Sequence, residues 1–109
     1  MNNVSNPPPS SGGEGRWRAA PDVIVRRVGL LADLAAALVV LGLASRLVLE
    51  VNGGVALSAL VGRRIVTVAV VQDERGGSAY VWGRSARFPA GAGVEMTRRA
   101  AAALAAGVR

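Results

Sequence analysis

Two runs of strand-forming residues, joined by a polar turn, constrain the fold of this chain more than any other feature. Residues 65–71 read IVTVAVV and residues 78–83 read SAYVWG. β-Branched and aromatic residues favour the pleated, packed surface of a sheet, and the sequence DERGG between the runs is typical of a turn. The sequence therefore predicts an antiparallel hairpin at the centre of the fold, with residues 73–77 as its turn.

This turn sets the expected pairing of the two strands. Counted outward from it, the pairs are Gln72 with Ser78, Val70 with Tyr80, Val68 with Trp82 and Val66 with Arg84. Side chains alternate between the two faces of a strand, and here both faces are apolar. An antiparallel hairpin with one face in water would alternate apolar and polar residues, so the second face of this hairpin calls for a covering partner.

An amphipathic helix is predicted before the strands, from Pro21 to about Ala44, with Asp22 as its N-cap. Gly42 lies near the expected end and would help to terminate the helix. The apolar side follows the i, i+3, i+4 spacing of a helix and comprises Ile24, Leu31, Leu34, Leu38 and Leu41.

A second hairpin is expected between this helix and the central one, from residues 46–51 and 55–61. A three-residue loop, residues 52–54, places apolar side chains opposite each other and puts Gly54 where such loops need a left-handed residue. The expected pairs are Val51 with Val55, Leu49 with Leu57 and Leu47 with Ala59.

The last part of the chain completes an α+β fold with a four-stranded antiparallel meander and both helices packed on one face. Pro89 and the glycines after residue 83 are interpreted as a connection, and residues 94–106 as an alanine-rich helix. Its expected buried side comprises Val94, Thr97, Ala101, Leu104 and Val108, with Met96 and Ala100 alongside. Residues 1–20, rich in proline, serine and glycine, are predicted to form a disordered tail, and residues 21–109 a single domain.

Composition argues against catalysis. The chain contains no histidine, cysteine or lysine, so the usual general base, the thiol nucleophile and the Schiff-base amine are absent. Asp73 and Glu74 are adjacent on the expected turn, which places them poorly as an acid–base pair. The sequence therefore predicts a non-enzymatic protein with no cofactor and no metal site. The lack of cysteine permits a reducing compartment, and a cytoplasmic location is expected.

The net charge of +6 comes entirely from scattered arginines. Arg84 and Arg87 are candidates for an anion site, because they flank a turn and residues 91–93 lead to a helix N-terminus, which attracts anions. Arginines beside aromatic rings can also bind single-stranded nucleic acid. That alternative is not favoured, since the strand pattern already explains Tyr80 and Trp82 and leaves only Trp17.

A membrane span through residues 28–44 is the other alternative. This stretch has 17 residues and one charge, Asp33. A span usually needs ~20 apolar residues, and a central aspartate costs roughly 2.5–3.5 kcal/mol on insertion. The leucine side and the alanine–glycine side of the helix also differ, as expected for a helix that lies on a sheet, so the soluble fold is favoured over the span.

The segment YVWGRSARFPAGAGVEMTRRAAAALAAGV, residues 80–108, is similar to the end of many short uncharacterised actinobacterial proteins. These have an aromatic strand, a proline and then an alanine-rich helix, and the order of their preceding helix and strands is also similar. The resemblance extends over about residues 28–108. It implies an accessory partner of a regulator, and it implies no catalytic residue and no substrate.

The strongest functional hypothesis concerns the sheet face that two helices leave uncovered. The expected covered face comprises Leu47, Leu49, Val51, Val55, Leu57, Val68, Val70 and Trp82. The opposite face would then expose Val48, Leu60, Ile65, Ala69, Val71 and Val81. An exposed apolar patch usually marks an interface, and the commonest soluble assembly is a two-fold dimer. The sequence thus predicts a protein-interaction module, either a homodimer or bound to an unidentified protein partner.

Overall fold

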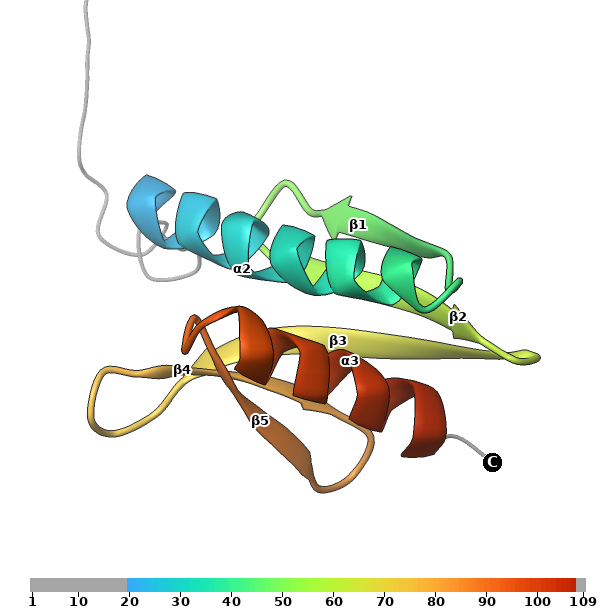
Figure 1. The fold of residues 1–109 in the computed structure, drawn as a ribbon. Coiled ribbons are helices and arrows are strands. Elements are labelled where there is room, and N and C mark those ends of the chain that lie inside the picture. Colours follow the sequence, from blue (N-terminus) through green and yellow to red (C-terminus); the bar gives the residue numbers. More distant parts are fainter. Residues whose placement is uncertain (1–19, 108–109) are drawn as a thin grey trace, which may run out of the picture.

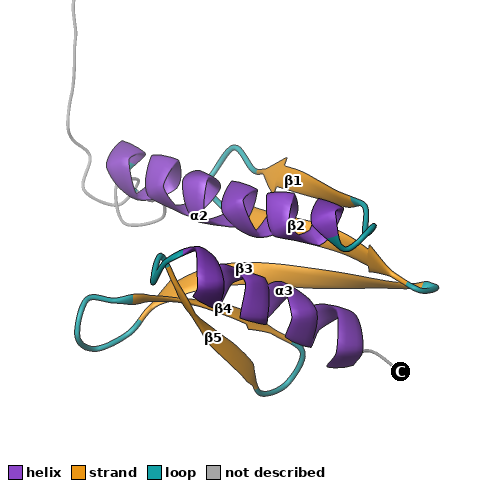
Figure 2. Ribbon diagram, in the orientation of Figure 1, coloured by secondary structure: helices purple, strands orange, loops and turns teal. Residues whose placement is uncertain are grey.

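The computed structural model describes residues 20–107, which form a five-stranded sheet with two helices (Figures 1 and 2). The elements in chain order are α2 (Pro21–Val40), β1 (Ser45–Leu49), β2 (Val55–Val61), β3 (Arg64–Gln72), β4 (Ser78–Trp82), β5 (Ala86–Ala90) and α3 (Val94–Gly107). The strands lie in the order β1-β2-β3-β4-β5, and all neighbours are antiparallel. The predicted α+β fold and its meander are confirmed. Except for Ala20, the predicted tail lies outside the described residues.

The sheet has five strands, so the predicted number of four is wrong. Residues 86–90, interpreted as a connection, form β5, in which Pro89 pairs with Ala79 of β4. Proline cannot donate to a neighbouring strand, and within sheets it is therefore confined largely to edge strands. β5 is an edge strand, so Pro89 does not interrupt the sheet.

Helix α2 begins earlier than its predicted cap. Ala20 is the N-cap residue and makes no side-chain cap hydrogen bond, Pro21 occupies the first turn, and Asp22 lies in that turn rather than at the cap. Proline suits this position because its missing N–H would have no partner inside the helix. The Asp22 carboxylate still interacts favourably with the positive end of the helix dipole.

The C-terminal end of α2 lies at Val40, not near Ala44. The Gly42 N–H donates to the Val39 carbonyl (2.8 Å), and the Leu43 N–H donates to the Leu38 carbonyl (2.9 Å). Gly42 has a φ of 80°. These bonds and the left-handed glycine form a Schellman motif, so Gly42 ends the helix as predicted.

The first hairpin is shifted by two residues from its predicted register. Leu49 pairs with Val55, so the loop is residues 51–53 instead of 52–54. The Gly53 N–H donates to the Glu50 carbonyl (2.9 Å), and Gly53, with a φ of 93°, takes the left-handed position expected for Gly54. The shift is an even number of residues, so each side chain of the strand keeps its predicted face.

The central hairpin has the predicted register near its turn. Gln72 pairs with Ser78 and Val70 with Tyr80. The Asp73 carboxylate accepts hydrogen bonds from the Arg75 and Gly77 N–H groups (2.9 and 2.8 Å).

Farther from this turn, β3 changes partner. Its residues 64–68 pair with β2, and its residues 69–72 pair with β4. The predicted pairs Val68–Trp82 and Val66–Arg84 are therefore absent from the ladder. β3 therefore connects two parts of the sheet, with β1 and β2 on one side and β4 and β5 on the other. The two pairs of strands run apart from each other in Figure 1.

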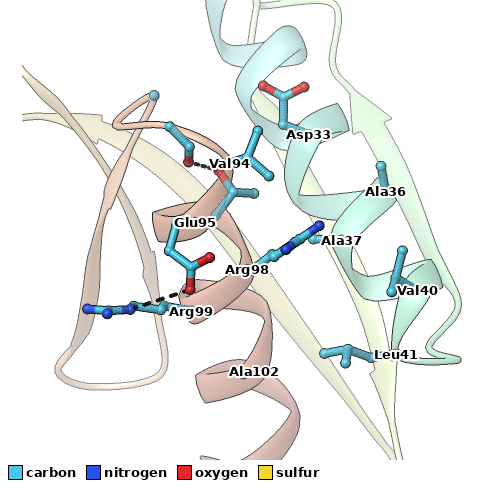
Figure 3. A pocket seen from close by; sticks show the side chains of 13 residues that line it. Asp33, Ala36, Ala37, Val40, Leu41, Val94, Glu95, Arg98, Arg99 and Ala102 are labelled. Carbon is cyan, nitrogen blue, oxygen red and sulfur yellow. Dashed lines mark hydrogen bonds and ion pairs between the residues drawn. The ribbon is translucent and has the colours of Figure 1, made fainter.

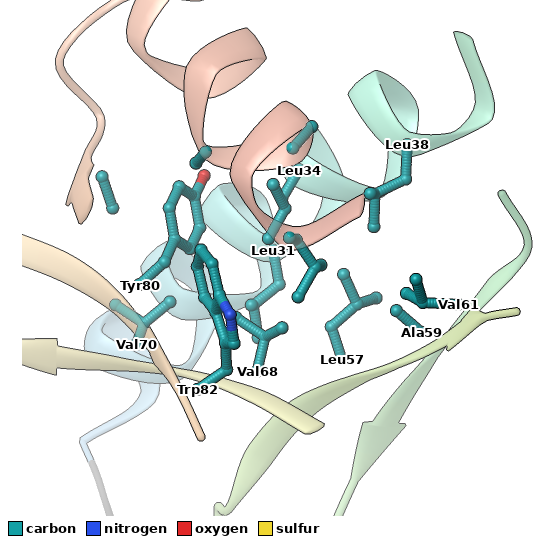
Figure 4. Packing of buried hydrophobic residues seen from close by; sticks show 14 residues of the cluster. Leu31, Leu34, Leu38, Leu57, Ala59, Val61, Val68, Val70, Tyr80 and Trp82 are labelled. Carbon is teal, nitrogen blue, oxygen red and sulfur yellow. The ribbon is translucent and has the colours of Figure 1, made fainter. Parts of the chain in front are cut away.

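The core lies between the two helices and one face of the sheet (Figure 4). Its largest fully buried side chains are Tyr80, Leu31, Leu34, Leu38, Leu57, Leu104 and Val68. Helix α2 buries Leu31, Leu34 and Leu38 as predicted, whereas Leu41 is exposed. Helix α3 buries Thr97, Ala100, Ala101 and Leu104. Its predicted core residue Val94 is exposed, and Val108 lies outside the described residues.

Tyr80 joins the sheet to both helices. Its ring is fully buried, and its hydroxyl donates to the Leu30 carbonyl of α2. Burial, reinforced by the negative charge of Asp33 and partly offset by a hydrogen bond with Thr97, raises the pKa of Tyr80 to about 12. The phenol therefore stays protonated at neutral pH and acts as a structural donor.

Candidate functional site: the open face of the sheet

The helices cover one face of the sheet, and the other face is free of any described element. We call this surface, made by Val48, Leu60, Ile65, Ala69, Val71 and Val81, the open sheet face. Ile65 is 71% exposed, Leu60 49% and Val48 40%, while the other three are half-buried by their neighbours in the sheet. The helices thus cover the face that contains Leu57 and Val68.

The register arranges the open sheet face in rows across the strands. Leu60 pairs with Ile65, and Ala69 pairs with Val81. A more polar row, Arg46, Ser58 and Thr67, crosses the face between the Leu60–Ile65 pair and the other apolar residues. The surface is therefore two apolar areas separated by a polar strip, rather than one unbroken patch.

Two residues expected on the covered face are exposed. Leu49 ends β1, and Val51 lies in the following loop. The two-residue shift of the hairpin carries Val51 out of the sheet, so this end of the molecule adds exposed apolar surface.

The arginines of the predicted anion site are exposed and lie close to one cavity. Arg84 is in the β4–β5 turn and Arg87 is on β5, and both line a small cavity of about 310 Å³ with Thr67 and Ser85. Residues 91–93, just before α3, lie beyond the far end of β5. At about 3.4 Å per residue, Gly91 is roughly 14 Å from Arg87 along the strand, and Arg84 lies beyond the other end of β5. The structure does not bring the helix N-terminus to the two arginines, and anion binding by these side chains alone stays a prediction.

Two of the three aromatic rings considered for base stacking are part of the core. Tyr80 is fully buried, and Trp82 is stacked on Phe88 with ring centroids 5.4 Å apart and an interplanar angle of 4°. Trp17 lies outside the described residues. Neither Tyr80 nor Trp82 presents a free ring face to a base.

A groove between α2 and α3, which the sequence argument missed, has a volume of about 830 Å³ (Figure 3). Alanines at positions 36, 37 and 102 line it and leave space between the helices. Its only ion pair among the described residues is Glu95 with Arg99 (4.0 Å), and both side chains are exposed, so the pair adds little stability. Small residues on the facing sides of both helices were the sequence signal for this groove.

The described part of the chain contains no group of three or more acidic, histidine or cysteine side chains able to hold a metal ion. Within residues 20–107, neither helix combines the length and the apolar character needed to cross a membrane.

Comparison with known proteins assigns no family to the chain. No protein-family model matches it, and no curated protein or solved structure shows significant similarity to it. The resemblance of residues 80–108 to short actinobacterial proteins stays a prediction. The function has to be inferred from the surfaces described above.

Proposed function

We propose that this chain is a non-catalytic protein-interaction module that forms a homodimer through its open sheet face. The observation that carries the proposal is the exposure of Ile65 and Leu60, two large apolar side chains that lie opposite each other on paired strands. Burying such side chains stabilises an assembly by about 25 cal/mol per Å² of apolar surface removed from water. A second copy presents the same surface and satisfies this requirement without any other partner.

The size of the face sets the expected strength of the dimer. Five strands about 4.8 Å apart and about five residues long span roughly 24 by 17 Å, or about 400 Å² per copy. Two copies would together bury about 800 Å², counted as the projected area of both faces. This is below the roughly 1,200–2,000 Å² of total surface that a standard interface buries. The dimer should therefore be weak, with a dissociation constant of about 10 μM or above.

The two arginines of the face lie at its border, where a partner can leave them in water. Arg46 is on the edge strand β1 and Arg87 is on the edge strand β5. Interfaces tend to have an apolar centre and a polar rim. A partner protein with its own apolar face is the alternative occupant. That alternative agrees with the accessory role implied by the resemblance and with a cytoplasmic location.

Analytical ultracentrifugation of the whole chain tests the homodimer. The wild type should change from monomer to dimer between about 10 and about 500 μM, a range chosen for so small an interface. The double variant Leu60→Lys/Ile65→Lys should stay monomeric and folded, because both side chains are solvent-exposed. Val25→Lys is the matched control, since Val25 on α2 is 71% exposed, as Ile65 is. It should dimerise like the wild type.

A monomeric wild type over the whole range would overturn the homodimer. So would equal weakening of the dimer by Val25→Lys and by the double variant, because general loss of apolar surface would then explain both. Specific capture of another protein, lost in the double variant only, would favour the alternative occupant.

A further inference from the structure

The first half of β3 has an unpaired edge inside the sheet. Residues 64–68 pair with β2, but the ladder to β4 begins only at Ala69. Backbone N–H and C=O groups point alternately to the two sides of a strand. Val61 and Arg64 are the paired residues that flank a two-residue turn, and in such a hairpin the flanking residues bond to each other. The backbone groups of Ile65 and Thr67 therefore point away from β2, toward a side with no ladder partner among the described residues.

A groove of about 610 Å³ lies beside this edge, and we call it the β3 groove. One wall is residues 64–67 of β3, and the opposite wall is residues 82–86 at the end of β4 and in the β4–β5 turn. Phe88 of β5 and Ala103 of α3 add an apolar floor. A row of free backbone groups beside apolar side chains is the arrangement that binds an extended peptide by strand addition.

The charge of the β3 groove selects the kind of peptide. Arg64 and Arg84 line it, and Arg87 lines the adjoining cavity, which shares Thr67 and residues 82–86 with the groove. None of the described aspartates and glutamates lines either cavity. The C-terminal end of α3 contributes about half a negative charge beside Gly107, which three full positive charges outweigh. Electrostatic complementarity therefore favours an acidic occupant.

We propose that the β3 groove binds an extended acidic segment of another protein, which adds as a strand beside Ile65 and Thr67. The parts of this chain outside the described residues do not suit the site. Residues 1–19 contain Arg16 and Arg18 against a single acidic residue, Glu14, and residues 108–109 end in Arg109. Pairing with a second copy at the same edge would bring the groove arginines of both copies together.

The probe is a fluorescent octapeptide of alternating glutamate and valine, with both ends blocked, and binding is measured by fluorescence anisotropy at low and high salt. One comparison peptide replaces glutamate by lysine, and the other keeps the glutamates but carries N-methyl groups on alternate backbone nitrogens. The acidic peptide should bind at least tenfold more tightly than either. High salt should weaken its binding, because charge attraction is screened.

Protein variants locate the binding edge. Thr67→Pro removes the N–H that points into the groove. It breaks no bond to β2, and proline is tolerated in a strand where its N–H would face away from the neighbouring strand. It should weaken peptide binding at least tenfold, while Thr67→Val, which retains the N–H, should leave binding within twofold. Arg84→Glu should weaken binding, and Arg75→Glu, in the exposed β3–β4 turn, should not. In the complex, the amide protons of Ile65 and Thr67 should exchange more slowly with solvent.

Equal binding of the N-methylated and unmodified peptides would overturn strand addition, as would binding that Thr67→Pro leaves unchanged. If Thr67→Pro does not fold, the N-methylated peptide and amide exchange still decide the question. Equally tight binding of a single-stranded oligonucleotide of the same charge would show an unspecific polyanion site instead. Leu60 belongs to the open sheet face but lines neither cavity. The single variant Leu60→Lys should therefore weaken the dimer and still bind the acidic peptide, so this proposal and the homodimer can fail independently.

Discussion

Raising the pH above 10 should destabilise this protein through one side chain, Tyr80. The chain has one tyrosine and no lysine, cysteine or histidine. Cysteine, tyrosine and lysine are the side-chain types that ordinarily lose a proton between about pH 8 and 12, and of these the chain contains only Tyr80. A change in stability between about pH 9 and 12 can therefore be assigned to Tyr80.

The expected size of the effect follows from the shift in pKa. In the unfolded chain the phenol titrates near its ordinary pKa of 10.0, whereas burial raises the pKa of Tyr80 to about 12 in the folded protein. Between these values the unfolded state releases its proton first, so stability falls as the pH rises, and below pH 10 the effect is absent. Two units correspond to about 2.7 kcal/mol in full, and about 1.4 kcal/mol is lost by pH 11.

Urea denaturation at pH 8 and pH 11, followed by circular dichroism, measures this loss. The matched control is Tyr80→Phe, which loses the hydroxyl bond to the Leu30 carbonyl at a cost of about 1 kcal/mol. Its stability should be the same at both pH values. Ultraviolet absorbance of the single tyrosinate gives the pKa directly, with a midpoint near 12 in the folded state and near 10 in urea. A folded-state midpoint near 10, or an equal loss of stability in Tyr80→Phe, would refute the argument.

Two further predictions concern the helices. Gly42→Ala should destabilise the protein by about 1–2 kcal/mol, because Gly42 has a φ of 80°; Gly29→Ala, inside α2 with nothing within 4 Å of the added carbon, should stabilise it by about 0.5–1 kcal/mol. Thermal denaturation checks both signs, and equal signs would contradict the Schellman assignment. Leu34→Ala should cost about 2–5 kcal/mol, since the side chain is fully buried, whereas Val25→Ala should change the midpoint of urea denaturation very little.

The features that the sequence predicted correctly depend on nearby residues. The spacing of Leu31, Leu34 and Leu38 fixes the buried side of α2 within two turns. The helix ends just before Gly42 through local bonds, because the N–H groups of Gly42 and Leu43 donate to carbonyls three and five positions before them. The turn that begins at Asp73 is likewise held by its own carboxylate, which accepts from N–H groups two and four residues ahead. The apolar alternation of the strands assigned the six residues of the open sheet face to one side, although it did not determine which side the helices cover.

The predictions of the first loop and of β5 were wrong for two different reasons. In the first loop two local conformations are equally good, and in β5 the position of the strand in the sheet decides whether proline is tolerated. Gly53 and Gly54 are adjacent, and either can take the left-handed place in a three-residue loop, so the sequence allowed two registers that keep the same faces. Pro89 would break a central strand but is tolerated in β5, because that strand is at the edge. Neither the register of the first hairpin nor the strand at Pro89 can be predicted from the neighbouring residues alone.

The change of partner along β3 is the least predictable feature, because it depends on both helices at once. Helix α2 packs on β1, β2 and β3, while α3 packs on β5. A twisted sheet rotates each strand by about 20–25° relative to its neighbour, so two helices that also contact each other follow different parts of it. α3 packs on β5, and the stack of Trp82 on Phe88 joins β4 to β5. The ladder from β3 to β4 stops at Ala69, and the backbone groups of Ile65 and Thr67 beyond it have no ladder partner on that side among the described residues.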